Sequence, residues 1–192
     1  MILLNRTASI KAVLPLESPT DLCWQLALHP SRYQIELMER MTSSDGPVDV
    51  AISAEKDECD SLRAAAMVVL WRTLATPGSR TMILAPSMPN SRACGEIGHL
   101  IMRYLVKLCK ERDLALSQVT RCEQWNRIEF GVEAGWQIRL VPNCPIMAKE
   151  SAKRSQTALI LCAGCIQNDF IEASRALEAA LDSDKALLLR LW

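Results

Sequence analysis

A strand-forming run, Val48-Asp49-Val50-Ala51-Ile52-Ser53, leads into an acidic segment, Ala54-Glu55-Lys56-Asp57-Glu58-Cys59-Asp60, and then into residues Ser61 to Thr76. The first run is rich in β-branched and apolar residues and predicts a strand. Residues 61–76 are apolar nearly all round and predict a buried helix, which Pro77-Gly78 ends. A strand that feeds a buried helix is the basic unit of an α/β domain with a parallel sheet.

Strands and helices continue to alternate on both sides of this unit. We expect a helix over 20–41, capped by Thr20 or Asp21 and interrupted at His29-Pro30-Ser31. The other expected elements are strands 81–85, 157–162 and 186–191, helices 91–112 and 169–181, and a hairpin of strands 127–132 and 136–141 through Glu133-Ala134-Gly135. The pattern predicts a three-layer α/β sandwich with a largely parallel sheet and a β-hairpin insertion. Residues 1–19 form an N-terminal segment and 20–192 a single domain.

Composition narrows the function classes. A chain of 192 residues is the size of one domain, and its 22 basic and 22 acidic residues balance, so no overall field favours nucleic acid or a membrane surface. The longest apolar stretches, Ala64 to Trp71 and Ala158 to Ile166, are shorter than the ~18 residues that span a bilayer. No secretion signal is recognisable, which favours the cytoplasm.

The eight cysteines include one C-x-x-C pair, Cys162-Ala-Gly-Cys165. A zinc site normally takes a second pair, and Cys122 and Cys144 are isolated with no histidine near either. Since Cys162 and Cys165 lie in a run of Ala, Leu and Ile, we expect them to be small buried core residues. A redox pair and a metal site are the alternatives, and no metal ligand is predicted.

In a sheet of this kind, a nucleotide-binding loop would lie between the strand at 48–53 and the buried helix. A working loop reads G-x-x-x-x-G-K-S/T, where the glycines let backbone N–H groups reach the phosphates, the Lys neutralises phosphate charge and the Ser/Thr holds Mg²⁺. Residues 54–61 contain no glycine, and four acids against one base give a local charge of 1 − 4 = −3. This segment does not match a phosphate cradle.

Several short motifs, taken with the order of elements, nevertheless resemble a known family. They are Trp24 followed by Pro30-Ser31-Arg32-Tyr33-Gln34, then Val50-Ala51-Ile52, Leu70-Trp71, Pro77-Gly78-Ser79 and Ala85-Pro86-Ser87. Together they resemble the ATPase domain of the large terminase subunit of tailed phages, over residues 20–192. Residues 158–181 resemble that family's Walker B strand and following helix, and 187–189 its next strand.

The resemblance implies where the family's functional residues would fall. Its loop glycines fall on Glu55, Asp57 and Cys59, its Lys on Asp60 and its Ser/Thr on Ser61. Its Walker B Asp and Glu, which hold the metal and activate water, fall on Leu161 and Cys162. The glutamine that contacts adenine in the family matches Gln34, although a surface glutamine is the alternative. Only Ser61 and Gln34 are retained, so both nucleotide motifs are expected to be degenerate.

Charge argues against residual nucleotide binding. A triphosphate beside this loop meets a repulsion of ~4 kcal/mol per close charge pair at an effective dielectric of about 20, and Lys56 alone does not offset it. Negative charge suits a helix N-terminus, so we expect Glu58 or Asp60 to cap the helix that starts at Ser61. An ordinary acidic surface turn is the alternative.

The resemblance therefore implies a pseudo-ATPase that acts through protein contacts in phage or prophage DNA packaging, without cofactor and without a nuclease domain. It would serve as a structural or regulatory subunit or as a competitor of the motor, with terminase subunits or the portal as partners and a homo-oligomer possible. The alternatives are a divergent packaging ATPase completed by a neighbouring subunit and a DNA-binding module. Neutral net charge disfavours duplex DNA, and Arg72, Arg80, Arg92 and Arg103 are expected on solvated faces.

Overall fold

The computed structural model describes the protein over a defined part of the chain. The described residues are 17–43, 48–50, 55–75, 80–85, 92–111, 119–122, 127–130, 136–142, 157–161, 171–172, 175 and 187–191. The predicted helix 169–181 falls mainly outside these ranges, with Ile171, Glu172 and Arg175 described as helical. Cys162, Cys165 and residues 1–16 of the predicted N-terminal segment 1–19 also lie outside them.

Two short helices precede the central unit. Helix α1 spans Pro19–Gln25 and helix α2 spans Arg32–Thr42. The cap of α1 is Ser18, whose Oγ accepts from the Asp21 N–H at 3.1 Å, so the prediction of Thr20 or Asp21 was wrong. Pro19 takes the first helical position, where a missing N–H has no energetic cost, so the helix begins closer to the N-terminus than predicted. The predicted interruption at residues 29–31 is confirmed.

Helix α3 spans Glu55–Ala75 and is the buried helix of the domain. From Ala64 to Leu70 every residue is at most 2% exposed, which confirms the prediction of a helix apolar all round. Its start differs from the prediction by six residues, since it begins at Glu55 and not at Ser61. Glu and Lys are good helix formers and the segment has no Gly or Pro, so nothing in it stops the helix from extending backwards.

Helix α4 spans Arg92–Glu111, in agreement with the predicted 91–112. Its predicted inner face is buried, as listed here: Ile97, Leu100, Ile101, Tyr104, Leu105 and Leu108. Arg103 and Lys110 lie exposed on the opposite face. The period of 3.6 residues thus placed this helix correctly.

One seven-stranded sheet lies behind the helices, in the order β1-β7-β6-β2-β5-β4-β3. The strands are β1 (Val48–Val50), β2 (Arg80–Ala85), β3 (Val119–Cys122), β4 (Arg127–Phe130), β5 (Trp136–Pro142), β6 (Thr157–Leu161) and β7 (Leu187–Leu191). Neighbours from β1 to β5 in this order are parallel, and β5, β4 and β3 are antiparallel. The largely parallel sheet and the β4–β5 hairpin were predicted, whereas β3 was not.

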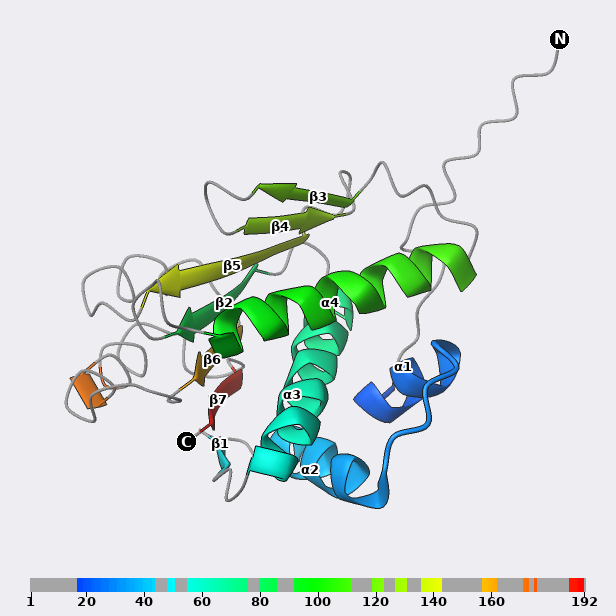
Figure 1. Ribbon diagram of the computed structural model, residues 1–192, viewed down its shortest axis with the longest axis horizontal. Helices are drawn as coiled ribbons and strands as arrows, with labels where there is room; N and C mark the ends of the chain where they lie inside the picture. The colour runs from blue at the N-terminus through cyan, green and yellow to red at the C-terminus, as the bar shows by residue number, and fades with distance from the viewer. Residues whose placement is uncertain are drawn as a thin grey trace, which may run out of the picture.

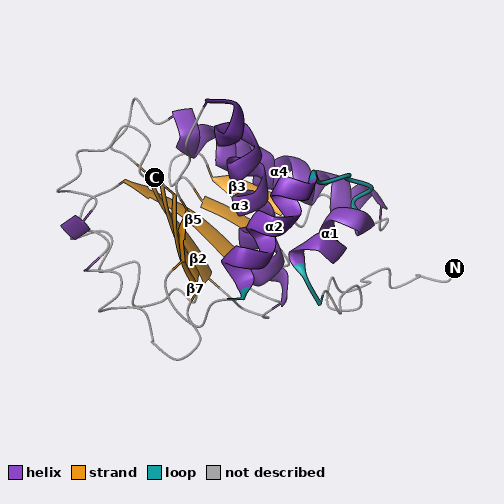
Figure 2. Cartoon of the chain, turned by 90° about the horizontal axis from the view of Figure 1, so that it is seen from below, coloured by secondary structure: helices purple, strands orange, loops and turns teal. Residues whose placement is uncertain are grey.

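Helices α1 to α4 gather on one face of the sheet (Figure 2). Helix α3 contacts β2, β5 and β6 below it and α1, α2 and α4 around it, as Figure 1 shows in part. The predicted third layer depends on residues 169–181 and stays a prediction. Among the described residues, no helix has the length and apolar character needed to cross a membrane.

A buried hydroxyl pair joins α3 to the sheet. The Oγ1 atoms of Thr73 and Thr81 lie 2.7 Å apart, and the Thr73 hydroxyl also lies 2.7 Å from the Val69 carbonyl oxygen. Both threonines are at most 1% exposed. Because each buried hydroxyl has a partner, the polar contact fixes how α3 lies on β2 without an unsatisfied group.

Candidate functional site

The junction of α2 and α3 brings together two of the residues that the resemblance singled out. Gln34 Nε2 donates to Asp60 Oδ1 at 3.0 Å, across 26 positions of sequence. The other end of the same amide, Oε1, accepts from the Ser31 N–H at 2.9 Å, which completes a capping box at the start of α2. Both ends of the Gln34 amide are therefore engaged within the protein.

Asp60 is not the helix cap that the sequence predicted. It lies in the second turn of α3, because the helix begins at Glu55. Its carboxylate accepts from Gln34 and from Arg63 Nη1, the latter at 3.5 Å. An exposed pair of this length adds little stability, so the Gln34 contact is the more specific of the two.

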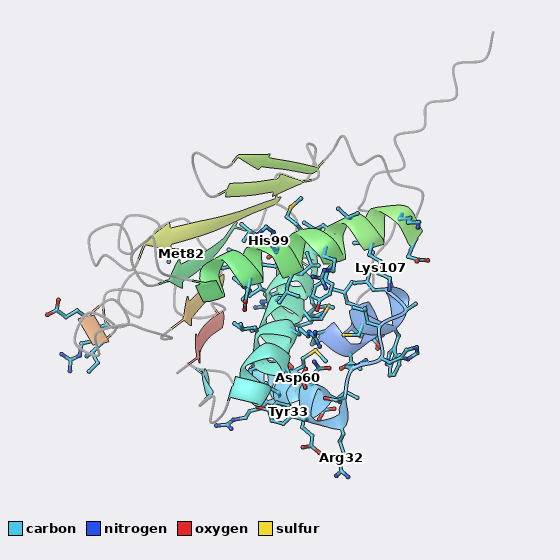
Figure 3. All side chains as sticks on the ribbon, viewed as in Figure 1. Arg32, Tyr33, Asp60, Met82, His99 and Lys107 are labelled. Atoms are coloured by element: carbon cyan, nitrogen blue, oxygen red, sulfur yellow. The ribbon has the colours of Figure 1, made fainter. Side chains whose placement is uncertain are left out.

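Ser61 is fully buried at the same junction. Its Oγ lies 3.2 Å from the Tyr33 hydroxyl, and Figure 3 shows Tyr33 and Asp60 where α2 meets the lower half of α3. A serine that holds Mg²⁺ needs an open hydroxyl beside the ion. In this chain that hydroxyl faces another helix and serves as a polar contact between α2 and α3.

The rest of the predicted loop is helical. Residues Glu55 to Cys59 form the first turn of α3. A helix that begins at Glu55 commits the N–H groups beyond its first turn, including that of Asp60, to carbonyls four residues earlier. The predicted Walker B position, Leu161, is the last residue of β6, paired with Leu191, which in turn pairs with Val50 of β1. Its neighbour Cys162 lies outside the described residues.

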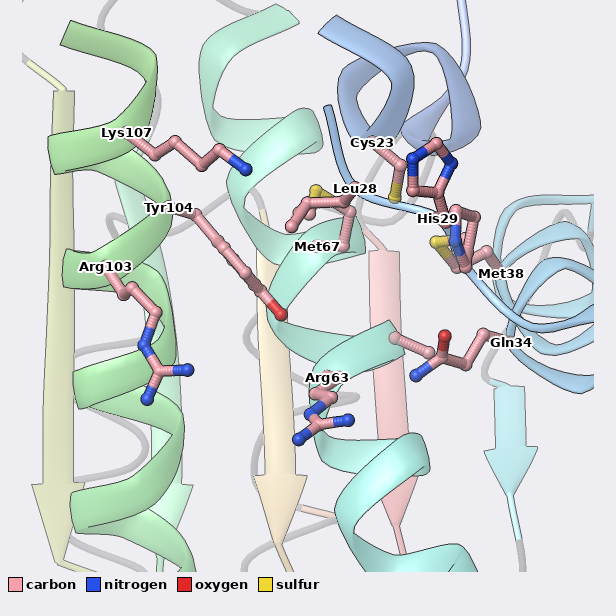
Figure 4. Close-up of a pocket in the computed structure, with 12 residues that line it drawn as sticks. Cys23, Leu28, His29, Gln34, Met38, Arg63, Met67, Arg103, Tyr104 and Lys107 are labelled. Carbon is pink, nitrogen blue, oxygen red and sulfur yellow. The ribbon is translucent and has the colours of Figure 1, made fainter. Parts of the chain in front are cut away.

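A cavity of about 290 Å³ lies beside this junction, between α4, α3 and the segment that joins α1 to α2 (Figure 4). Its apolar lining includes Cys23, Leu28, Met38, Met67 and Ala64, and its polar lining includes His29, Gln34, Arg63, Arg103, Tyr104 and Lys107. Met38 and Met67 are almost fully buried, so they form the floor. Gln34 and Arg63 belong both to the cavity and to the α2–α3 junction.

The wall formed by the α1–α2 segment depends on a specific helix ending. The Leu28 N–H donates to the Cys23 carbonyl and the Ala27 N–H to the Trp24 carbonyl, both at 2.9 Å. These are the two hydrogen bonds of a Schellman motif, with Ala27 in the left-handed conformation at φ 47° where glycine is usual. Lys107 Nζ lies 3.4 Å from the Ala27 carbonyl oxygen and ties this turn to α4.

Burial raises the pKa of the Cys23 thiol to about 11. The thiol lines the cavity, but the side chain is only 4% exposed, and the apolar surroundings disfavour the thiolate. Cys23 therefore acts as an apolar wall residue and not as a nucleophile. Within the described residues no group of His, Cys, Asp and Glu could hold a metal ion.

Sequence reasoning missed the cavity although its residues were visible. The prediction that Arg103 lies on a solvated face is correct. That Arg103 and Arg63 line the same cavity depends on how α3 and α4 pack. The spacing of Arg103 and Lys107 by four residues was the available signal, because that spacing places both on one side of a helix. His29 also lines the cavity, with its ring edge-on to Trp24 at a centroid distance of 6.0 Å.

No protein-family model matches the chain, and no curated protein matches it in sequence. Among solved structures, the large terminase ATPase domain of Thermus phage P74-26 matches 91% of this chain and 69% of its own, at 17% identity and a TM-score of 0.58. A point variant of that domain gives 16% identity and a TM-score of 0.63 over the same shares. The large terminase of bacteriophage HK97 matches 85% of this chain at 11% identity and a TM-score of 0.57, and this chain spans 33% of it.

The chain therefore has the fold of the ATPase domain of phage large terminases. This confirms the fold that the sequence motifs implied. At these identities the likeness concerns the fold, and the degenerate nucleotide motifs stay a prediction.

Proposed function

We propose that this protein is a pseudo-ATPase that acts through protein contacts in phage or prophage DNA packaging. The packaging context is carried over from the fold of the terminase ATPase domains. The partners proposed on the same ground are terminase subunits or the portal, with the chain as a structural or regulatory subunit or as a competitor of the motor.

The observation that carries the proposal is that Asp60 and Ser61 of α3 are both in contact with α2, through Gln34 and Tyr33 respectively. An acid stands where the resemblance places a lysine, and it is bonded to the glutamine that would contact adenine. The serine that would hold Mg²⁺ is fully buried against Tyr33. A nucleotide would have to break these contacts, pay the desolvation cost of the groups it separates and meet the negative charge of the first turn of α3.

The test is thermal unfolding of the purified chain with and without millimolar Mg-ATP or Mg-ADP. A ligand at a hundred times its dissociation constant stabilises the native state by about 2.7 kcal/mol, which raises the melting temperature of a domain of this size by roughly 5 to 10 °C. We expect no shift and no phosphate release. A nucleotide-dependent shift would contradict the proposal and favour a divergent ATPase.

A second experiment addresses the partners and the two alternatives. The tagged chain, captured with cross-linking from a phage-infected host, is expected to retain terminase subunits or the portal. The captured assembly is then assayed for ATP hydrolysis that requires this chain, which would reveal a site completed by a neighbouring subunit. Recovery of duplex DNA in place of these proteins would favour the DNA-binding module.

A further inference from the structure

The cavity beside α3 combines an apolar floor with a basic rim. Met38, Met67 and Leu28 contribute apolar atoms, while Arg63, Arg103 and Lys107 stand around the opening. Figure 4 shows the Tyr104 and Lys107 side chains extending from α4 toward α3, with Arg103 running down alongside α4 and Arg63 on α3 below Tyr104. Methionine side chains adapt to differently shaped partners, a property of many peptide-binding surfaces.

Charge on this surface is unbalanced although the whole chain is neutral. The residues that line the cavity include three basic side chains, Arg63, Arg103 and Lys107, and no acid, which gives a formal charge of +3. Two of the cations have weak protein partners, since Arg63 lies 3.5 Å from Asp60 and Lys107 lies 3.4 Å from a carbonyl oxygen. The exposed guanidinium of Arg103 has no hydrogen bond or ion pair to any described residue.

An exposed aromatic side chain lies against His29, one of the residues that line the cavity. Trp24 is 52% exposed and contacts His29, which lines the cavity. Exposed tryptophan and arginine beside an apolar hollow are the residue types that dominate binding energy at protein interfaces. A nucleic-acid backbone would use the cations but would leave the apolar floor without a partner.

We propose that this cavity binds an acidic segment of a protein partner. One large apolar side chain of the segment enters the hollow over Met38 and Met67, while flanking carboxylates pair with Arg63, Arg103 and Lys107. The guanidinium groups suit this role because their planar donors match carboxylates with two hydrogen bonds. The inference rests on the proposed function only in that the chain acts through protein contacts, and it adds the chemistry of the partner.

The proposal is tested with a displayed library of random dodecapeptides selected on the immobilised whole chain, without nucleotide. We expect enriched peptides to carry an aromatic or large aliphatic residue flanked by Asp or Glu. For the best synthetic peptide, Arg103→Glu is expected to weaken binding about tenfold or more, because the charge pairing is reversed. Replacement of the peptide's acids by their amides should weaken binding comparably.

The matched control is Arg32→Glu, which reverses a 93% exposed arginine on α2 outside the cavity and should leave affinity unchanged. Trp24→Ala, which keeps the charge, should also weaken binding, and the melting temperature of each variant verifies folding. The proposal is overturned by absence of enrichment, by equal binding to the Arg103→Glu variant, or by Arg103-dependent binding of duplex DNA in preference to the peptide. None of these results changes the Mg-ATP test, so the two proposals fail separately.

Discussion

At the scale of single residues, Ala27 is the described position where the backbone is least suited to its side chain. A left-handed conformation costs an L-residue roughly 1 to 2 kcal/mol, and glycine avoids this cost but loses about 0.4 to 1 kcal/mol through a freer unfolded chain. We therefore expect Ala27→Gly to raise the free energy of unfolding by up to about 1.6 kcal/mol. Ala27→Val should lower it, because branching at Cβ crowds the same conformation. Urea unfolding of both variants measures the difference, and a less stable Ala27→Gly would contradict the assigned turn.

Cys23 gives a second prediction at this scale. With the pKa of its thiol at about 11 against the usual 9.0, its thiolate fraction near neutral pH is on the order of a hundredfold below that of an ordinary cysteine. We expect iodoacetamide to label Cys23 much more slowly in the native chain than in urea, as resolved by peptide mass spectrometry. Native labelling at the rate of the unfolded chain would show that the thiol is open to solvent.

The same pKa fixes the sign of a pH effect. The fold favours the protonated thiol, so its contribution to stability is full below about pH 9 and is lost as the pH rises toward about 11. Unfolding free energies across this range should fall more steeply for the wild type than for Cys23→Ala. Parallel pH profiles for the two proteins would remove Cys23 as the cause.

At the scale of elements, the α2–α3 junction depends on Gln34 and Asp60. Gln34→Ala removes the hydrogen bond that Gln34 Oε1 accepts from the Ser31 N–H and the hydrogen bond that Gln34 Nε2 donates to the Asp60 carboxylate. We therefore expect the free energy of unfolding to fall by about 1 to 3 kcal/mol. In a double-mutant cycle with Asp60→Ala, the coupling should be about 1 kcal/mol. Glu36→Ala on the same helix, which breaks only an exposed ion pair, should cost less than about 0.5 kcal/mol. Additive effects of Gln34→Ala and Asp60→Ala would show that the two side chains do not stabilise each other.

These elements also show what the sequence could predict. Burial of α3 followed from its apolar residues nearly all round, burial of the inner face of α4 from the period of its apolar residues, and the parallel sheet from the alternation of strands and helices. The start of α3 was missed because a loop was expected between the first strand and the buried helix, where the residues themselves favour helix. Strand β3 has only four residues, and its identity comes from pairing with β4. The cavity depends on how α1, α3 and α4 pack, which no local pattern encodes.

At the scale of the whole molecule, α3 is the element that contacts both the other helices and the sheet. It contacts α1, α2 and α4 on its sides and three strands beneath, and it supplies more buried residues to the described hydrophobic core than any other element does. A helix in this position should unfold only together with the rest of the domain. The α2–α3 junction and the cavity both sit on it, and their geometry therefore depends on the stability of the domain as a whole.

Leu70→Ala tests this dependence. Leu70 is fully buried, so removal of its side chain leaves a cavity and should cost about 2 to 5 kcal/mol of unfolding free energy. The matched control is Val106→Ala on α4, because Val106 is 40% exposed; this change should lower the free energy of unfolding by less than about 0.5 kcal/mol. Urea unfolding should be followed by far-ultraviolet circular dichroism and by tryptophan fluorescence, which report on backbone and packing. If α3 holds the domain together, both signals shift to the same lower midpoint in Leu70→Ala, because one cooperative transition carries them. A variant in which fluorescence changes early while helical signal persists to the wild-type midpoint would show that α3 and its partners unfold independently.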